Sequence, residues 1–191
     1  KTVTIDGADA KDLDDAISIE AGPQGGWRLM VHIADVGYYV KEGSALDREA
    51  FIRGTSVYLV DRVIPMLPPK LSNGICSLNA GEDRLAMTVI MDIDRRGKVV
   101  RYEIVPSVIR VDRRMTYEEV RKILLENDPV LQENYRDFLP ELQMMAELSR
   151  ILYANRLQRG AVDFNFHEVK VILDEQGKPQ ALEKRWRTIA E

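Results

Sequence analysis

The sequence predicts an α+β fold, in which a mixed but mostly antiparallel sheet is flanked by helices. In the first third of the 191-residue chain, short strand-like runs alternate with turns that contain Gly and Pro. Further on, a charged turn separates two apolar runs, which is the pattern of a β-hairpin. Most of the second half instead repeats its apolar residues with the period of a helix.

Strands come first along the chain. Residues 2–5 and 16–20 are short runs that contain several β-branched side chains. Trp27–Ala34 alternates large apolar and polar residues, as a half-buried strand does. The Gly and Pro content of residues 21–26 predicts the turn between the last two strands.

A short helix and an irregular loop follow. Ser44, with Asp47 three positions later and a short apolar run beyond, predicts a capped helix. The closely spaced Pro65, Pro68 and Pro69 predict an ordered loop in place of regular structure.

Two hairpins are expected. Residues 85–93 and 99–105 are apolar runs on either side of a charged turn at 94–98. Residues 169–173 and 179–184 form a second pair of strand-like runs around their own short polar turn.

Helices lie between these hairpins. Thr116 is a suitable N-cap and acidic residues follow it, which predicts a helix to about Glu126. Apolar residues with a helical period then predict a long helix over 138–158, which ends before Gly160.

Composition excludes several functional classes. The single cysteine, Cys76, rules out an internal disulfide scaffold and a Cys-rich zinc module. Because no uncharged apolar run approaches about 18 residues, we expect no membrane span. The formal charge of -4 is unlike that of a domain that holds nucleic acid by charge alone. Any grip on nucleic acid must therefore come largely from elsewhere, and we interpret the chain as part of a longer polypeptide.

The most informative segment is an aspartate-rich run at residues 6–15 (DGADAKDLDD). Two unit charges about 4 Å apart repel by about 4 kcal/mol at a protein-like effective dielectric, so converging carboxylates need a cation or raised pKa values. Oxygen-only ligands select Mg²⁺ or Mn²⁺ over zinc. The alternative is a solvated turn between strands. Gly7 permits a sharp bend, and Leu13 with residues 16–17 would attach the run to a core, which favours a built site.

The pattern of aspartates narrows the metal chemistry. A calcium-binding loop would need a third ligand where Ala16 stands. A phosphoaspartate phosphatase would need Thr or Val after its D-x-D, whereas Asp15 follows Asp14 here. Metal-assisted phosphodiester hydrolysis remains, in which two ions about 3.5–4 Å apart activate water and receive the leaving oxyanion.

Beyond the acidic run, motifs along nearly the whole chain match a known family in order. They are residues 4–17 (TIDGADAKDLDDAI), 31–36 (VHIADV), 43–47 (GSALD), 56–59 (SVYL), 64–68 (IPMLP), 76–79 (CSLN) with 84–86 (RLA), 115–120 (MTYEEV) and 159–164 (RGAVDF). Together they resemble the opening of the RNB-type catalytic domain of the ribonuclease II and ribonuclease R exoribonucleases, and they look closer to ribonuclease R.

The resemblance implies processive, metal-dependent hydrolysis of RNA from its 3′ end, with release of nucleoside 5′-monophosphates. Asp6, Asp12, Asp14 and Asp15 match the family's active-site set and would be ligands of Mg²⁺, with Mn²⁺ as a possible substitute. Asp14 and Asp15 would be catalytic; Asp14 is expected to be indispensable, because it would help hold the second ion or the attacking water. Asp9 lies outside this set.

The resemblance also implies how RNA would be held. Tyr58 matches an aromatic residue that stacks on the terminal nucleotides and sets the length of the final product. Phe166 would face it across the base, with Phe164 as the alternative. Tyr117 lies where the family contacts the ribose, and a contact to the 2′-hydroxyl distinguishes RNA from DNA. Ordinary core packing is the other interpretation of each aromatic.

The family's catalytic domain is larger than this chain. Residues 1–191 would be its amino-terminal portion, without the later part that supplies an arginine and further acidic groups. The flanking cold-shock-type and S1 domains would also lie outside. We therefore expect a cytoplasmic protein with the 3′ end of single-stranded RNA as its partner, no membrane partner, and little exonuclease activity in the isolated chain.

Two other functional classes stay open. One is an RNA-binding module of the same fold without catalysis, and the other is a divalent-cation-binding structural domain. The remaining polar residues carry bland expectations. His32 should be a hydrogen-bonded core residue, His167 a surface residue and Cys76 a small buried one. Arg113 and Arg114 could contact phosphate, but a pair of arginines before a helix is more often solvated, and we expect the latter.

Overall fold

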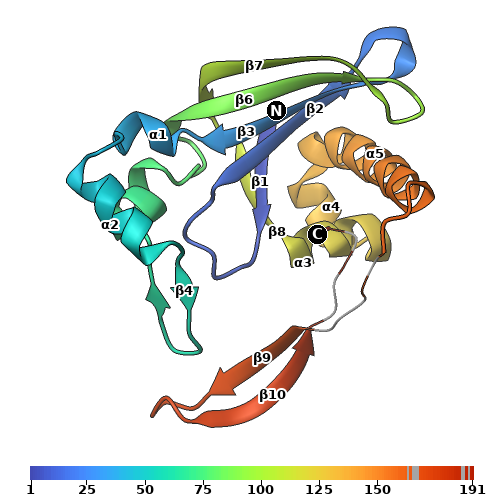
Figure 1. Ribbon diagram of the computed structural model, residues 1–191. Helices are drawn as coiled ribbons and strands as arrows, with labels where there is room; N and C mark the ends of the chain where they lie inside the picture. Colours follow the sequence, from blue (N-terminus) through green and yellow to red (C-terminus); the bar gives the residue numbers. More distant parts are fainter. Residues whose placement is uncertain (163, 165–167, 186–187, 189) are drawn as a thin grey trace.

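The structure is a computed structural model that describes residues 1–162, 164, 168–185, 188 and 190–191. Its main sheet has six strands in the order β7-β6-β3-β2-β1-β8 (Figure 1). Neighbours pair antiparallel, except that β1 and β8 are parallel. The strands are β1 (Thr2–Asp6), β2 (Asp15–Ala21), β3 (Trp27–Ala34), β6 (Asp83–Ile93), β7 (Val99–Arg110) and β8 (Arg113–Thr116). The predicted mixed, mostly antiparallel sheet is therefore confirmed.

Helices and two small hairpins complete the fold. The helices are α1 (Val36–Tyr39), α2 (Ala45–Arg53), α3 (Tyr117–Arg121), α4 (Pro129–Asn134) and α5 (Leu139–Gln158), with shorter helical turns η1 (Pro23–Gly25), η2 (Leu71–Ile75), η3 (Lys122–Glu126) and η4 (Arg136–Phe138). The hairpins pair β4 (Val57–Tyr58) with β5 (Val63–Ile64), and β9 (Glu168–Leu173) with β10 (Pro179–Arg185).

Local sequence signals account for most element boundaries. The Ser44 side chain accepts the Asp47 N–H at 3.1 Å and so caps α2, as predicted. Thr116 and Glu119 form a reciprocal capping box at the start of α3. The expected hairpin of β6 and β7 is present, and β7 is longer than predicted, reaching Arg110.

Several short elements were not predicted from the sequence, among them β8, α1 and α4. Strand β8 has only four residues, of which Met115 alone is fully buried, so it shows no alternation. Helix α1 has four residues and α4 has six, and neither buries a side chain. Their sequences therefore contain no apolar stripe from which a helix could be predicted. In the proline-rich loop, Pro65 and Pro68 lie outside regular structure, as expected, whereas Pro69 begins the helical turn that continues into η2.

Three apolar clusters hold these layers together. Helix α5 packs on one face of the sheet, where Leu148 meets Ile19, Trp27 and Ile93 (Figure 1). A neighbouring cluster joins α5, α3 and η3 to β1 and β8. The third cluster lies toward α1 and α2 and includes Leu13 from the acidic run.

The buried polar residues behave as expected. His32 is 5% exposed, and its ring nitrogens lie 2.9 Å from Ser18 Oγ and 2.8 Å from Thr88 Oγ1. Burial lowers its pKa, which favours the neutral ring. Cys76 is buried as predicted, and His167 lies outside the described residues.

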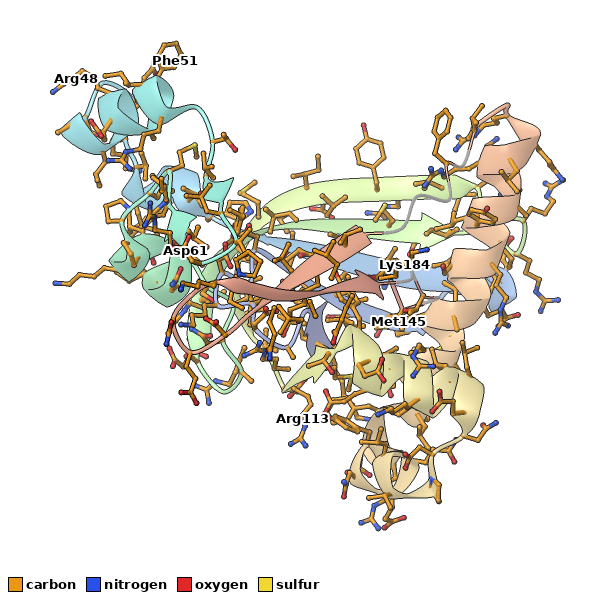
Figure 2. All side chains as sticks on the ribbon, turned by 90° about the horizontal axis from the view of Figure 1, so that it is seen from below. Arg48, Phe51, Asp61, Arg113, Met145 and Lys184 are labelled. Atoms are coloured by element: carbon orange, nitrogen blue, oxygen red, sulfur yellow. The ribbon has the colours of Figure 1, made fainter. Side chains whose placement is uncertain are left out.

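Helix α2, unlike this interior, carries strongly exposed side chains. Arg48 and Phe51 of α2 project outward at an edge remote from Lys184 of β10 (Figure 2), and Phe51 is 88% exposed. Among the helices of the described residues, none combines the length and the apolar character that crossing a membrane requires.

Candidate active site

The aspartate-rich run forms the loop between β1 and β2, which are neighbours in the sheet. Its apolar residue, Leu13, is 2% exposed and packs in the cluster toward α1 and α2. The Leu13 N–H donates to Ser77 Oγ at 3.1 Å, and its carbonyl accepts the Leu78 N–H at 2.9 Å. The Ser77 hydroxyl in turn donates to the Lys11 carbonyl at 2.9 Å. The loop is therefore attached to the core, as its sequence predicts.

A second attachment comes from β8. Arg114 Nη2 donates to the carbonyls of Gly7, Ala8 and Ala10, at 3.3, 3.2 and 2.8 Å. Arg114 is half-buried, so the expectation that it is solvated was wrong. It was wrong because β8 was not predicted, and β8 is what carries this side chain to the loop. Arg113 stays exposed, with its guanidinium 4.9 Å from the centre of the Tyr135 ring.

The loop carboxylates influence one another. The pKa of Asp14 is raised, first by partial burial and then by the negative charges of Asp12, Asp15 and Asp6. The pKa of Asp15 is also raised, by burial and by Asp6, although a backbone hydrogen bond opposes the shift. Both side chains still keep a large surface open to solvent, so water weakens these effects without removing them. The four predicted residues thus lie near enough to repel.

The carboxylates are nevertheless not arranged as a finished metal centre. Within the described ranges, no three Asp, Glu, His or Cys side chains are placed to hold one metal ion. Asp9 lies apart from the other four, 82% exposed and 3.7 Å from Lys170 Nζ. Carboxylate oxygens are the donors that Mg²⁺ and Mn²⁺ prefer, so the chemistry of the donor set fits such an ion.

Tyr58, on the β4–β5 hairpin, contacts this loop. Its hydroxyl donates to Asp12 Oδ2 at 2.7 Å, and this hydrogen bond raises the pKa of Tyr58 to about 12. The side chain is 65% exposed, so core packing does not explain it. An exposed aromatic ring therefore stands directly beside a carboxylate of the loop.

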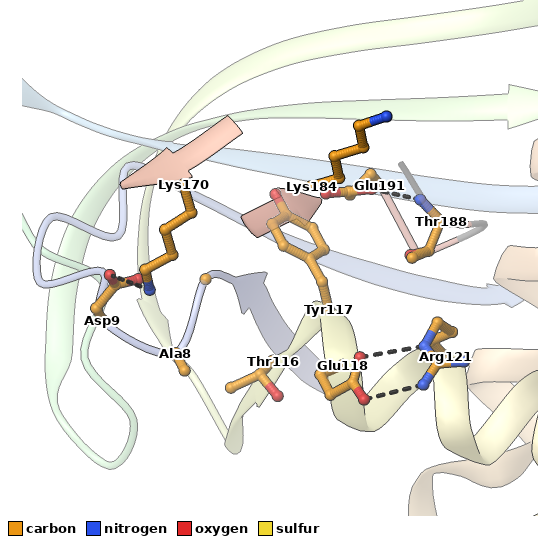
Figure 3. Close-up of a pocket in the computed structure, with 11 residues that line it drawn as sticks. Ala8, Asp9, Thr116, Tyr117, Glu118, Arg121, Lys170, Lys184, Thr188 and Glu191 are labelled. Carbon is orange, nitrogen blue, oxygen red and sulfur yellow. Dashed lines mark hydrogen bonds and ion pairs between the residues drawn. The ribbon is translucent and has the colours of Figure 1, made fainter. Parts of the chain in front are cut away.

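Tyr117 lines a pocket of about 550 Å³ between the acidic loop, the start of α3 and the C-terminal hairpin (Figure 3). The pocket is lined by Gly7, Ala8, Asp9, Thr116, Tyr117, Glu118, Arg121, Lys170, Lys184, Thr188 and Glu191. The Tyr117 ring rises into its middle, with Lys170 on one side and Lys184 on the other (Figure 3). Phe166, the predicted partner of Tyr58, lies outside the described residues, whereas Phe164 is 68% exposed.

A family model described as the RNB domain matches residues 1–191. The chain belongs to the RNB domain family. The predicted family resemblance is therefore confirmed.

Individual relatives of this RNB domain agree. Ribonuclease R of Thermotoga maritima is 58% identical over 190 residues, which cover 99% of this chain and 26% of that protein. Ribonuclease R 1 of Lactococcus lactis is 50% identical over 190 residues, covering 100% and 23%. Among solved structures, Mycoplasma genitalium RNase R in complex with ribose methylated single-stranded RNA matches with a TM-score of 0.89 at 32% identity, covering 99% of this chain and 29% of that one. The chain spans about a quarter of the length of these relatives.

Sequence reasoning about this RNB domain missed three basic residues. Arg114 precedes the helix in the run of residues 115–120 and was treated as part of a solvated pair. Lys170 and Lys184 belong to the β9–β10 hairpin, where nothing in the spacing of lysines distinguishes a pocket residue from a solvated one. Only the folded chain places them beside Tyr117.

Proposed function

We propose that residues 1–191 are the amino-terminal portion of a single RNB-type catalytic domain in a processive 3′-to-5′ exoribonuclease. The enzyme would hydrolyse RNA and release nucleoside 5′-monophosphates. One observation carries this proposal: a loop attached to the core gathers four mutually repelling aspartates, and the exposed ring of Tyr58 stands against them. The name Ribonuclease R, which the relatives from Thermotoga maritima and Lactococcus lactis carry, supports the same activity.

Asp6, Asp12, Asp14 and Asp15 would hold two Mg²⁺ ions, and Mn²⁺ could replace them. When bound, such ions supply an activated water and stabilise the leaving oxyanion. The raised pKa values of Asp14 and Asp15 support this assignment, because a bound cation would offset both causes of the shifts, which are partial burial first and the neighbouring negative charges second. Asp14 and Asp15 would be the catalytic pair, and Asp14 would help to hold the second ion or the attacking water.

The aromatic residues would hold the end of a single RNA strand. The Tyr58 ring would stack on a terminal base, an interaction worth about 1–3 kcal/mol that tolerates any sequence. Phe166 would pack on the other side of that base. Tyr117 would contact a ribose, and a contact to its 2′-hydroxyl would favour RNA over DNA. Lys170 and Lys184, which flank Tyr117 in the pocket, would lie near the phosphates.

The remainder of the enzyme would supply what this portion lacks. We expect further catalytic-domain residues, including an arginine, and flanking cold-shock-type and S1 domains to complete the RNA channel. The net charge of -4 supports this division, because a complete channel for RNA would be basic. The enzyme would act in the cytoplasm without a membrane partner, and the isolated chain would have little activity.

A second candidate is an RNA-binding module that does not hydrolyse its ligand. It is favoured by one observation, that no three acidic, His or Cys side chains of the described segments already surround a metal position. In this alternative the loop carboxylates would bind no ion. Tyr58 and Tyr117 would still hold the RNA end.

Hydrolysis of a 5′-labelled oligoribonucleotide with Mn²⁺ distinguishes these candidates. The intact protein should shorten the substrate from its 3′ end and release mononucleotides, whereas residues 1–191 alone should do so only slowly. Titration with Mn²⁺ should show saturable binding that fails in the Asp14→Asn variant. Tight RNA binding without Mn²⁺ binding or cleavage would favour the binding module. Rapid release of mononucleotides by the isolated chain would instead refute its expected inactivity.

A further inference from the structure

Arg114 has an unusual set of contacts for a side chain beside an acidic loop. Its Nη2 atom donates to three consecutive or nearly consecutive carbonyls, those of Gly7, Ala8 and Ala10. None of the hydrogen bonds found for Arg114 goes to a carboxylate, although five aspartates lie in residues 6–15. The guanidinium therefore binds the backbone of the loop and leaves the carboxylates available.

The fold explains how Arg114 reaches this position. Strand β8 runs parallel to β1, and Arg114 pairs with Thr4 in their register. Strand β1 ends at Asp6, so the loop leaves the sheet beside β8. The side chain then spans from the edge strand to the first turn of the loop. This turn is closed by the Ala10 N–H, which donates to the Gly7 carbonyl at 3.2 Å.

The contacts fix the part of the loop between two predicted metal ligands. Asp6 precedes the turn and Asp12 follows it, so the path of the backbone between them sets the spacing of their carboxylates. At Leu13 the loop is already attached to the core through Ser77 and Leu78. Without Arg114, three polar contacts of the turn itself remain among the described residues: its own Ala10–Gly7 hydrogen bond, the Gly7 N–H that donates to Asp6 Oδ1 at 2.6 Å, and the exposed Asp9–Lys170 ion pair.

We propose that Arg114 is a positioning residue of the nuclease site. By holding the carbonyls of residues 7, 8 and 10, it sets the separation of Asp6 and Asp12 so that both reach the same divalent cation. Arg114 acts through the loop and touches neither the cation nor the RNA. An arginine suits this role because its guanidinium stays charged and so always donates to these carbonyls, and its charge offsets the adjacent carboxylates. The inference rests on the proposed function for the identity of the cation site.

The neighbouring residue provides a matched control. Arg113 lies one position earlier on β8, points to the other face, and stacks on Tyr135 at 4.9 Å. In Figure 2 it projects away from the β9–β10 hairpin. Replacing Arg113 removes the same charge from the same strand without touching the loop carbonyls. A loss specific to Arg114 would therefore report on the loop.

The test compares Arg114→Gln, Arg114→Lys and Arg113→Gln in the intact protein. The first measurement is Mn²⁺ affinity without RNA, by titration with detection of free Mn²⁺ by electron paramagnetic resonance. Arg114→Gln should weaken Mn²⁺ binding by about 10- to 100-fold, the range typical for residues that orient metal ligands. Arg114→Lys should lose less, and Arg113→Gln should stay within about twofold of the wild type.

Two further measurements keep the test independent of folding and of activity. Amide hydrogen exchange at residues 7–11 should become faster in Arg114→Gln, while exchange in β2 and β3 stays unchanged and shows that the sheet is folded. With RNA, kcat should fall as Mn²⁺ affinity falls, and KM should change by less than about threefold.

Several outcomes would overturn the proposal. These are unchanged Mn²⁺ affinity in Arg114→Gln, an equal loss in Arg113→Gln, or unchanged exchange in the loop. If Arg114→Gln fails to fold, Arg114→Lys decides by the same Mn²⁺ and exchange measurements. If every protein, the wild type included, binds Mn²⁺ as expected and none cleaves RNA, the proposed function fails while the positioning role of Arg114 stands.

Discussion

Aspartates in two turns of this molecule have opposite electrostatic surroundings: one turn stabilises the charged carboxylate, and the other destabilises it. At the tip of the β6–β7 hairpin, Asp94 Oδ1 accepts the N–H groups of Arg96 and Lys98, both at 2.9 Å. These hydrogen bonds lower the pKa of Asp94, which favours its charged form. In the β1–β2 loop, the pKa values of Asp14 and Asp15 are raised instead.

The difference shows which aspartates are structural. The charged carboxylate of Asp94 is stabilised by N–H groups and basic side chains of its own turn. Asp174, at the tip of β9–β10, repeats that arrangement with the N–H groups of Gln176 and Lys178, both at 2.9 Å. Asp14 has no comparable donor among its pKa-determining contacts and faces other carboxylates. A cation bound from solution would stabilise a carboxylate of this kind.

The largest expected effect is on RNA hydrolysis, when the charge of Asp14 in the acidic loop is removed and compared with removal of the charge of Asp94 in the hairpin. In the intact protein, Asp14→Asn should reduce RNA hydrolysis by about 10³-fold or more, because metal ions contribute several kcal/mol to such reactions. RNA affinity should change little, since stacking and phosphate contacts remain. Single-turnover cleavage and filter binding measure the two quantities. Asp94→Asn is the control and should cleave RNA at the wild-type rate; equal losses in both variants would erase the distinction between the turns.

A smaller effect separates the ring of Tyr58 from its hydroxyl. Tyr58→Ala removes a stacking surface worth about 1–3 kcal/mol and should lengthen the final product of digestion. Tyr58→Phe keeps the ring and loses only the hydrogen bond to Asp12, so its final product should keep the wild-type length. High-resolution gels of the end products measure this. An unaltered ladder in Tyr58→Ala would remove Tyr58 from the RNA clamp.

A smaller change still is expected from the pocket lysines. Lys170→Gln should weaken RNA binding a few-fold and lower the slope of log K against log[salt] by about one phosphate contact. Lys178→Gln is the control, because Lys178 lies at the exposed tip of the same hairpin and outside the pocket. Binding isotherms across a range of salt concentrations give both slopes. Equal slopes for the two variants would place the phosphates elsewhere.

The sequence predicted that the acidic loop is attached to the core, but it did not predict which side chains from other elements contact the loop. Leu13 within an acidic run was enough to predict attachment of the loop to the core, because a buried leucine has no role in a free turn. Apolar periodicity predicted β3 and α5, and a pair of apolar runs around a charged turn predicted the β6–β7 hairpin. The role of Arg114 depends on β8, whose four residues carry one fully buried side chain and pair with residues more than a hundred positions away. No local pattern records such a pairing.

The smallest expected effect is a change in melting temperature, with opposite signs for substitutions in the β1–β2 loop and in the β6–β7 turn. Without metal, Asp14→Asn should raise the melting temperature by up to about 2–4 °C, because it relieves a repulsion worth at most about 1 kcal/mol at an exposed site. Asp94→Ala should lower the melting temperature, because the N–H groups of Arg96 and Lys98 lose their acceptor. Thermal unfolding of the intact protein with a chelator present measures both shifts.

The pH dependence gives this comparison its sharpest form. The raised pKa of Asp14 means that its contribution to stability is present at low pH and is lost as the pH rises through that raised value. The lowered pKa of Asp94 means the reverse: its contribution is present at neutral pH and is lost as the pH falls through its lowered value. The shifts in melting temperature caused by Asp14→Asn and Asp94→Ala should therefore have opposite signs at pH 7. Both shifts should shrink as the pH falls through the range where these carboxyls take up protons.

Added Mn²⁺ should raise the melting temperature of the wild type at pH 7 but not that of Asp14→Asn. If Asp14→Asn instead destabilises the metal-free protein, its carboxylate is held by donors of its own, as Asp94 is, and the loop does not require a cation.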